Sequence, residues 1–184
     1  DYIHSLWART MGLVFIFRFL FFLIRGSLSK KLIRRLMVVV FLAALAAIFG
    51  WIMVSSGLIT RPWVNTYKLT IHLGLGIALF VYLFFTWLSY RGYERVVVNK
   101  EWSRITLILI VLVIMQICFG GFVSGMKAAL SYPTCPLMDG LWIPDVVKDA
   151  DNWTVANFLL YDKSRFMAAL VQVVHRNLGY LIAI

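Results

Sequence analysis

Long runs of apolar residues, separated by shorter polar stretches, make up most of this chain. A helix that crosses a bilayer needs about 20 predominantly apolar residues, and five segments reach that length: residues 2–24, 36–58, 67–89, 105–126 and 166–184. A helix satisfies its backbone amides and carbonyls within the segment, as lipid requires. The pattern therefore predicts an all-α fold, a polytopic membrane helical bundle with five transmembrane helices in this chain.

The composition excludes the main alternative classes. Of the 184 residues, 62% are hydrophobic and only 14% are charged, whereas soluble domains carry about a quarter charged residues. The 16% of aromatic residues argues against disorder, because disordered chains are poor in such residues. Two cysteines are too few for a disulfide-built secreted domain. An integral membrane protein, with the lipid bilayer as its surroundings, remains.

The net charge of +10 raises the question of nucleic acid, but nearly all basic residues lie at the ends of apolar runs. We therefore expect no nucleic-acid partner. The loops after the first and third spans, within residues 25–35 and 90–104, carry nine basic residues, against six on the opposite side. Basic loops stay in the cytoplasm, so spans 2–24, 67–89 and 166–184 are predicted to begin outside, at the periplasmic or outer face.

Three histidines, His4, His72 and His175, all lie in the spans that begin outside. A helix rises 1.5 Å per residue, which places His72 and His175 within about 15 Å of the outer surface. They could be structural histidines bonded to backbone or to one another, or they could be metal ligands. Zinc wants several further ligands, and the spans offer only Asp1 and Cys118. Haem iron needs one or two imidazoles and an apolar slot, which these helices could supply.

Glycines and arginines near the histidines bear on the haem interpretation. Small residues such as Gly74 and Gly179 let a flat ring approach a helix, although they also serve helix packing. Arg9 and Arg176 each lie within two turns of a histidine, where a bare guanidinium in lipid is costly. A haem propionate would be a suitable bidentate partner, and so would a lipid phosphate reached by snorkelling. Both possibilities stay open.

A weak internal repeat separates the chain into two parts. Asp1 precedes His4 by three residues, and Gln172 precedes His175 by three, in spans of the same direction. This predicts two copies of a four-helix unit: residues 1–104 as an N-terminal half-bundle with three spans, and residues 105–184 as the start of a C-terminal half-bundle with two spans and an outer loop, 127–165. Only the carboxylate can act as a general base one turn from its histidine. The first half is therefore the predicted reaction site, and the second half the predicted cofactor site.

Several of these stretches occur together in one known family. The chain resembles haem A synthases, and most closely the class that includes the mitochondrial form and alphaproteobacterial proteins. The similar stretches follow the family's order along the chain: DYIHSLWAR at 1–9, GWIMVSSGL at 50–58, IHLG at 71–74, GFVSG at 121–125, WIP at 142–144 and HRNLG at 175–179.

The resemblance implies an eight-helix protein with twofold pseudo-repeat, of which this chain is an internal fragment holding the second to sixth helices. It implies that His4 and His72 flank the substrate, haem O, and that His175 binds a haem b cofactor with a partner outside the chain. The three histidines would thus be axial ligands of haem iron, with Asp1 catalytic and Arg9 and Arg176 contributing to haem binding.

The implied activity is oxidation of a ring methyl of haem O to the formyl group of haem A, with water as the oxygen source, for cytochrome oxidase assembly. The implied location is the bacterial plasma (inner) membrane or the mitochondrial inner membrane. A haem O synthase, an unidentified electron acceptor and a second copy of the chain are the expected partners. The alternative is a bis-histidine, di-haem b-type electron-transfer cytochrome that does no chemistry on its haems.

Two positions depart from the family pattern, and the cysteines provide a further test. Asp1 stands where the family has glutamate, and Ser5 where an arginine usually follows the first histidine. Some members carry a cysteine pair in an outer loop, whereas Cys135 is alone in the loop 127–165 and Cys118 lies within a span. A loop disulfide within this chain is therefore not expected, and Cys135 is interpreted as structural.

Overall fold

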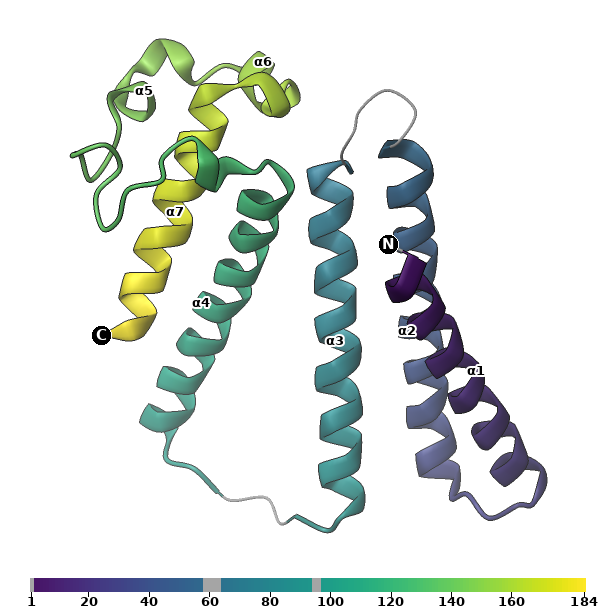
Figure 1. The fold of residues 1–184 in the computed structure, drawn as a ribbon. Helices are drawn as coiled ribbons and strands as arrows, with labels where there is room; N and C mark the ends of the chain where they lie inside the picture. The colour runs from purple at the N-terminus through teal and green to yellow at the C-terminus, as the bar shows by residue number, and fades with distance from the viewer. Residues whose placement is uncertain (1, 58–63, 94–96) are drawn as a thin grey trace. The chain divides into compact units, whose positions relative to one another are not determined.

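The described part of the chain is built mainly from five long helices. A computed structural model describes residues 2–57, 64–93 and 97–184. The long helices are α1 (Tyr2–Ile24), α2 (Lys30–Gly57), α3 (Thr66–Tyr90), α4 (Lys100–Gly125) and α7 (Arg165–Ala183) (Figure 1). All five are long and apolar enough to cross a membrane. The predicted all-α membrane fold with five spans is confirmed.

Polar caps precede α2, α3, α4 and α7. The Ser29 hydroxyl accepts from the Leu32 amide, at 3.2 Å, before α2, and the side-chain oxygen of Asn65 accepts from the Tyr67 amide, at 3.0 Å, before α3. The caps before α4 and α7 are Asn99 and Ser164. Such side chains satisfy amides that have no partner within the helix. As a result α2 and α4 start earlier than the predicted apolar spans, which began at residues 36 and 105.

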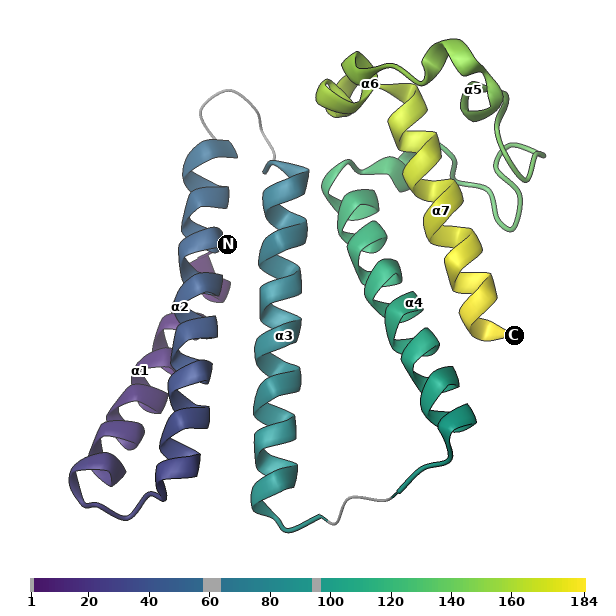
Figure 2. The same ribbon diagram turned by 180° about the vertical axis from the view of Figure 1, so that it is seen from behind.

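The chain divides into two compact units, and α2 and α3 contribute to both. One unit comprises Asp1–Ile48 and Leu75–Glu94, and the other comprises Phe49–Gly74 and Arg95–Ile184. In the second unit α7 lies alongside α4 in both ribbon views (Figures 1 and 2). The division predicted from the repeat, at residues 104 and 105, concerns sequence copies rather than contacts, and it stays a prediction.

The segment between α4 and α7, residues 127–165, is called the connecting segment below. It contains five short helices: η1 (Ala128–Leu130), α5 (Asp145–Lys148), η2 (Ala150–Asn152), α6 (Val155–Leu159) and η3 (Tyr161–Lys163). The Trp153 indole donates to the Val147 carbonyl at 2.9 Å and its ring meets Phe166 edge to face, with centroids 5.1 Å apart. The segment is thereby fixed to the start of α7.

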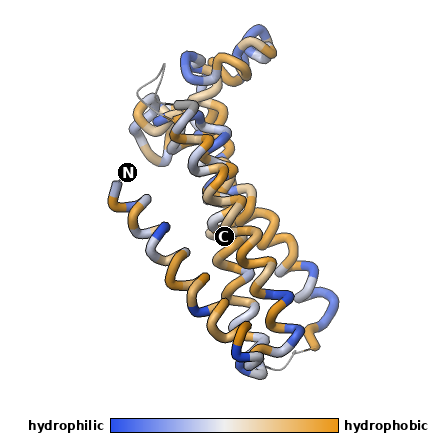
Figure 3. Tube along the Cα trace, turned by 90° about the vertical axis from the view of Figure 1, so that its right-hand side faces the viewer, coloured by the Kyte–Doolittle hydropathy of each residue, from blue (hydrophilic) through white to orange (hydrophobic). Residues whose placement is uncertain are grey.

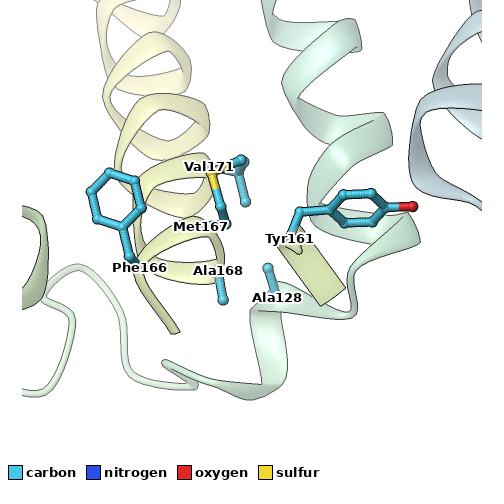
Figure 4. Packing of buried hydrophobic residues seen from close by; sticks show 6 residues of the cluster. All are labelled: Ala128, Tyr161, Phe166, Met167, Ala168 and Val171. Carbon is cyan, nitrogen blue, oxygen red and sulfur yellow. The ribbon is translucent and has the colours of Figure 1, made fainter. Parts of the chain in front are cut away.

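A small apolar core forms where the connecting segment meets α7. Its buried members come from η1, η3 and the first turns of α7, and they are shown in Figure 4: Ala128, Tyr161, Phe166, Met167, Ala168 and Val171. Elsewhere the long helices are apolar along their length (Figure 3) and carry many exposed large hydrophobic side chains. Exposed apolar surface of this extent suits lipid or further transmembrane helices rather than water.

Candidate functional site

His72 of α3 packs against a glycine of α2. A Cβ atom added at Gly50 would lie 2.9 Å from Cε1 and 3.2 Å from Nδ1 of His72. Real Cβ atoms essentially never come as close as the first of these distances, so glycine is required for the imidazole to occupy this place. The glycine of the GWIMVSSGL stretch and the histidine of the IHLG stretch therefore form one structural unit.

His175 of α7 repeats this arrangement against α4. A Cβ atom added at Gly120 would lie 3.2 Å from Cε1 of His175. One turn earlier on α4, the Gln116 amide nitrogen lies 3.5 Å from Nε2 of His175. Gln116 and Gly120 are four residues apart and so share a face of α4. That face therefore contacts the His175 imidazole at two points: Gly120 packs against Cε1, and the Gln116 amide lies next to Nε2.

The His175 site has unsatisfied hydrogen-bonding capacity. Within the described part of the chain, Nδ1 of His175 and Oε1 of Gln116 are both buried and have no hydrogen-bond partner. Buried polar atoms without partners cost free energy, so such atoms point to a ligand. No cluster of three His, Cys, Asp or Glu side chains occurs among the described residues. A single imidazole beside apolar surface fits an axial ligand of haem iron.

The surface of α3 is open at Gly74. A Cβ atom added there, two residues after His72, would meet nothing within 4 Å. Residues two apart lie on different faces of a helix, so this space does not adjoin the His72 ring, and the predicted role of Gly74 beside a flat ligand stays a prediction. Gly179, which was predicted to serve a similar purpose near His175, instead faces Gln116, because a Cβ atom added there would lie 3.3 Å from the Gln116 amide nitrogen.

Packing of α3 on α4 sets the position of His72. Gly121 and Gly125 are buried on α4, and added Cβ atoms would lie 2.7 Å from the Thr70 hydroxyl and 2.9 Å from the Thr66 hydroxyl, respectively. Small residues four apart allow transmembrane helices to approach closely. The GFVSG stretch of α4 therefore makes a close helix contact. On α3 this contact includes Thr70, two residues before His72.

Gln172, the amide counterpart of Asp1 in the repeat, has a structural partner. Its side chain is 2% exposed and its amide nitrogen donates to the Ala128 carbonyl. Ala128 begins η1, the turn that follows α4. The amide therefore links α7 to the end of α4, a bond that an ionised carboxylate could not donate.

Arg176 holds the connecting segment. One of its terminal nitrogens donates to the Thr134 carbonyl at 2.7 Å and to the Leu137 carbonyl at 3.4 Å, and the other donates to the Tyr132 carbonyl at 2.7 Å. A guanidinium has five N–H donors. These backbone bonds use part of that capacity, and the predicted role of Arg176 at a haem propionate stays a prediction.

The sequence-predicted residues of α1 belong to a different unit from the other predicted histidines. His4 and Arg9 lie in the unit that contains α1, and both are exposed. His72 and His175 lie in the other unit. Asp1 lies outside the described residues. The pairing of His4 with His72 and the catalytic role of Asp1 therefore stay predictions.

The two cysteines are free, Cys118 within α4 and Cys135 in the connecting segment. Cys135 is exposed, and its Sγ lies 3.9 Å from the Tyr180 hydroxyl of α7. The same hydroxyl donates to the Pro136 carbonyl at 3.4 Å. This environment is compatible with the structural interpretation of Cys135.

Gln116 was missed in the sequence analysis. It is an amide in the apolar run LILIVLVIMQICF, where polar residues tend to be functional. Gln116 lies four residues before Gly120, and this spacing would have indicated that the two residues share a helix face. Its partner on α7 lies 59 residues further along the chain and could not be read from that spacing.

Comparison with known proteins supplies the family. The model of a family described as cytochrome oxidase assembly protein matches residues 1–184. Curated relatives that match the chain carry the name heme A synthase. The protein of Wolbachia pipientis wMel is 39% identical, over 99% of this chain and 51% of its own length. The proteins of Nitrosospira multiformis and Flavobacterium psychrophilum are 35% and 31% identical, each over 100% of this chain and 51% and 52% of their own lengths. The chain thus spans about half the length of these relatives. No solved structure matches it.

Proposed function

The chain belongs to the cytochrome oxidase assembly protein family, and we propose that it is part of a membrane enzyme that oxidises a ring methyl of haem O to the formyl group of haem A. Relatives named heme A synthase match it from end to end. The observation that carries the proposal is that two histidine rings are packed in the same way, His72 against Gly50 and His175 against Gly120. Two imidazoles held in this way are suited to two haems.

In this proposal different histidines bind the two haems. His4 and His72 ligate the substrate haem O. His175 ligates a haem b cofactor together with a residue outside this chain. Its buried, unpartnered Nδ1 and the nearby amide of Gln116, both among the described residues, support a ligand at this position. Bound haem b supplies one-electron transfer, toward an acceptor outside this chain.

The remaining residues position the substrate and handle protons. Arg9 binds a propionate of haem O, and Arg176 binds a propionate of haem b through donors that its backbone partners leave free. Asp1, three residues before His4 in the sequence, takes a proton as the ring methyl is oxidised in successive steps, with the new oxygen atom coming from water. An aspartate reaches one methylene less far than the glutamate usual in the family.

The proposed setting is the bacterial plasma (inner) membrane or the mitochondrial inner membrane, with the histidines toward the periplasmic or outer face. A haem O synthase supplies the substrate, and cytochrome oxidase assembly consumes the product. The full-length protein associates with a second copy of itself.

The test is production of the full-length protein in cells that lack their own haem A synthase, followed by chromatography of the extracted haems. The parent protein is expected to yield haem A, and His72→Ala and His175→Ala to yield none. Asp1→Asn is expected to stop haem A production while haem b stays bound. Asp145→Asn, which changes an exposed carboxylate that pairs with Lys148, serves as the matched control and should behave as the parent. A parent that retains two haems b and produces no haem A would instead support the di-haem cytochrome.

A further inference from the structure

A small polar cavity lies between the beginning of α2 and the end of α3, and no histidine lines it. Both helix ends belong to the unit that contains α1. The cavity has a volume of about 70 Å³, enough for more than a single water molecule, whose share of liquid volume is about 30 Å³. Its polar and charged lining residues are Ser29, Lys31, Arg35, Thr86, Ser89 and Tyr90.

Thr86 carries an unused hydroxyl at this cavity. Its side chain is 5% exposed, and within the described residues its Oγ1 is buried without a hydrogen-bond partner. Other helical hydroxyls in the chain donate to the carbonyl four residues earlier, as Ser89 does to Phe85 at 2.8 Å and Thr70 to Thr66 at 3.0 Å. A buried hydroxyl that forgoes this bond is available to a bound ligand.

The charge of the lining is positive. Lys31 and Arg35 are one turn apart on α2, and none of the lining residues is acidic. The Arg35 guanidinium stands over the Phe85 ring, with Cζ 5.2 Å from the ring centroid, and this contact restricts its position. The cavity also lies at the N-terminal end of a 28-residue helix, where the helix dipole favours an anion. A tetrahedral oxyanion matches two cations, the unused Thr86 hydroxyl and a helix N-terminus.

The position along the helices agrees with a ligand at the membrane surface. Arg35 lies about 8 Å along the axis from the start of α2 at Lys30, given the rise per residue of a helix, and Tyr90 ends α3. Basic pockets between transmembrane helices at this level bind the headgroups of anionic lipids. We propose that this cavity binds a phosphate group through Lys31, Arg35 and Thr86, either as the headgroup of an anionic phospholipid or as free phosphate.

The experiment uses the full-length protein in detergent. Phosphatidylglycerol and phosphatidylcholine are titrated separately and bound lipids are counted by native mass spectrometry, while inorganic phosphate is titrated by calorimetry. Lys31→Gln and Arg35→Gln are each expected to weaken binding of the phosphate-bearing probe about fivefold, the contribution of one cation near a membrane surface. Thr86→Val removes only the hydroxyl and should weaken binding about tenfold. Because that hydroxyl has no hydrogen-bond partner among the described residues, the valine variant should keep its thermal stability.

Arg34→Gln is the matched control, since Arg34 is the exposed neighbour of Arg35 and does not line the cavity. Arg34→Gln should leave binding of the phosphate-bearing probe unchanged. Loss of phosphatidylglycerol binding in the three cavity variants, with no binding of inorganic phosphate by the parent, assigns a lipid headgroup. Binding of inorganic phosphate that the same variants weaken assigns free phosphate. Equal losses in Arg34→Gln and Arg35→Gln, or unchanged binding of both probes in all cavity variants, would overturn the proposal.

Discussion

Single glycines determine where the two histidine rings of the second unit can lie. A Cβ atom added at Gly50 would lie 2.9 Å from Cε1 of His72, closer than real Cβ contacts come. A Cβ atom added at Gly120 would lie 3.2 Å from Cε1 of His175, so a small shift of the ring would accommodate it. Both contacts are made by a ring rather than by a flexible chain end. The two positions therefore differ in how far they depend on glycine, and this difference can be measured.

We predict that Gly50→Ala displaces the His72 ring and lowers stability by about 1–3 kcal/mol, as overpacking of a filled site does. Gly120→Ala should have the same effect on His175 with a smaller magnitude. Gly74→Ala is the control, because a Cβ atom there meets nothing within 4 Å. Thermal unfolding and haem absorption spectra of the full-length variants provide the readout. A Gly74→Ala variant as damaged as Gly50→Ala would contradict the steric account.

The amide of Gln172 provides a second prediction. Gln172→Glu replaces the donor to the Ala128 carbonyl by a carboxylate that must be protonated or leave the carbonyl unpaired. We expect a loss of about 1–3 kcal/mol, the cost of a buried unsatisfied polar group, measured by denaturation in detergent. Asn177→Asp makes the same chemical change at an exposed site, where the amide donates to the Val173 carbonyl at 2.7 Å. That control should change stability little, and an equal loss in both variants would argue against a specific role for Gln172.

Helices α3 and α4 approach each other through their small residues. Added Cβ atoms at Gly121 and Gly125 would lie 3.3 Å and 3.0 Å from the backbone α-carbons of Thr70 and Thr66, in addition to their approach to the hydroxyls. Backbone atoms cannot rotate out of the way as a side-chain end can. The whole helix must therefore move when either glycine is enlarged.

We predict that Gly125→Ala separates α3 from α4 and lowers stability by about 1–3 kcal/mol. A second change, Thr66→Ser, should not restore it, because the backbone of residue 66 still lies too close to the added methyl group. Gly12→Ala in α1, where a Cβ atom meets nothing within 4 Å, should be neutral or slightly stabilising. Thermal melting of the three proteins decides. Full rescue by Thr66→Ser would mean that the side-chain methyl, rather than the backbone, limits the approach.

The helices themselves could be predicted from sequence because apolar run length alone determines which segments cross lipid. The error at the start of α2 and α4 arose because Lys30, Lys31 and Lys100 were counted as loop, although basic side chains readily extend a helix into the headgroup region. The pairing of Gln116 with His175 and of Arg176 with the Thr134 carbonyl could not be predicted. Each joins residues far apart along the chain, and nothing in the local pattern encodes such a contact.

In the chain as a whole, the connecting segment is held to the long helices at separate points. Tyr67 of α3 donates its hydroxyl to the Phe158 carbonyl at 3.2 Å, and its ring meets Tyr161 edge to face with centroids 4.9 Å apart. Arg176 of α7 holds the earlier part, around Thr134. These two attachments involve different residues of the segment, which also contacts α7 at Trp153 and Ala128, so we expect each to be released without the other.

We predict that Arg176→Lys loosens residues 132–137 but leaves residues 145–163 in place. A lysine ammonium presents its donors from one point and cannot reproduce the fork that reaches the Thr134 and Tyr132 carbonyls together. Hydrogen–deuterium exchange of the full-length protein should therefore rise several-fold in peptides covering 132–137. Arg165→Lys, at an exposed position in the first turn of α7, is the control and should change exchange nowhere in the segment. Tyr67→Phe should give the opposite pattern, with faster exchange near residue 158 only. If both variants loosened the entire segment together, its two attachments would be one cooperative unit rather than two independent ones.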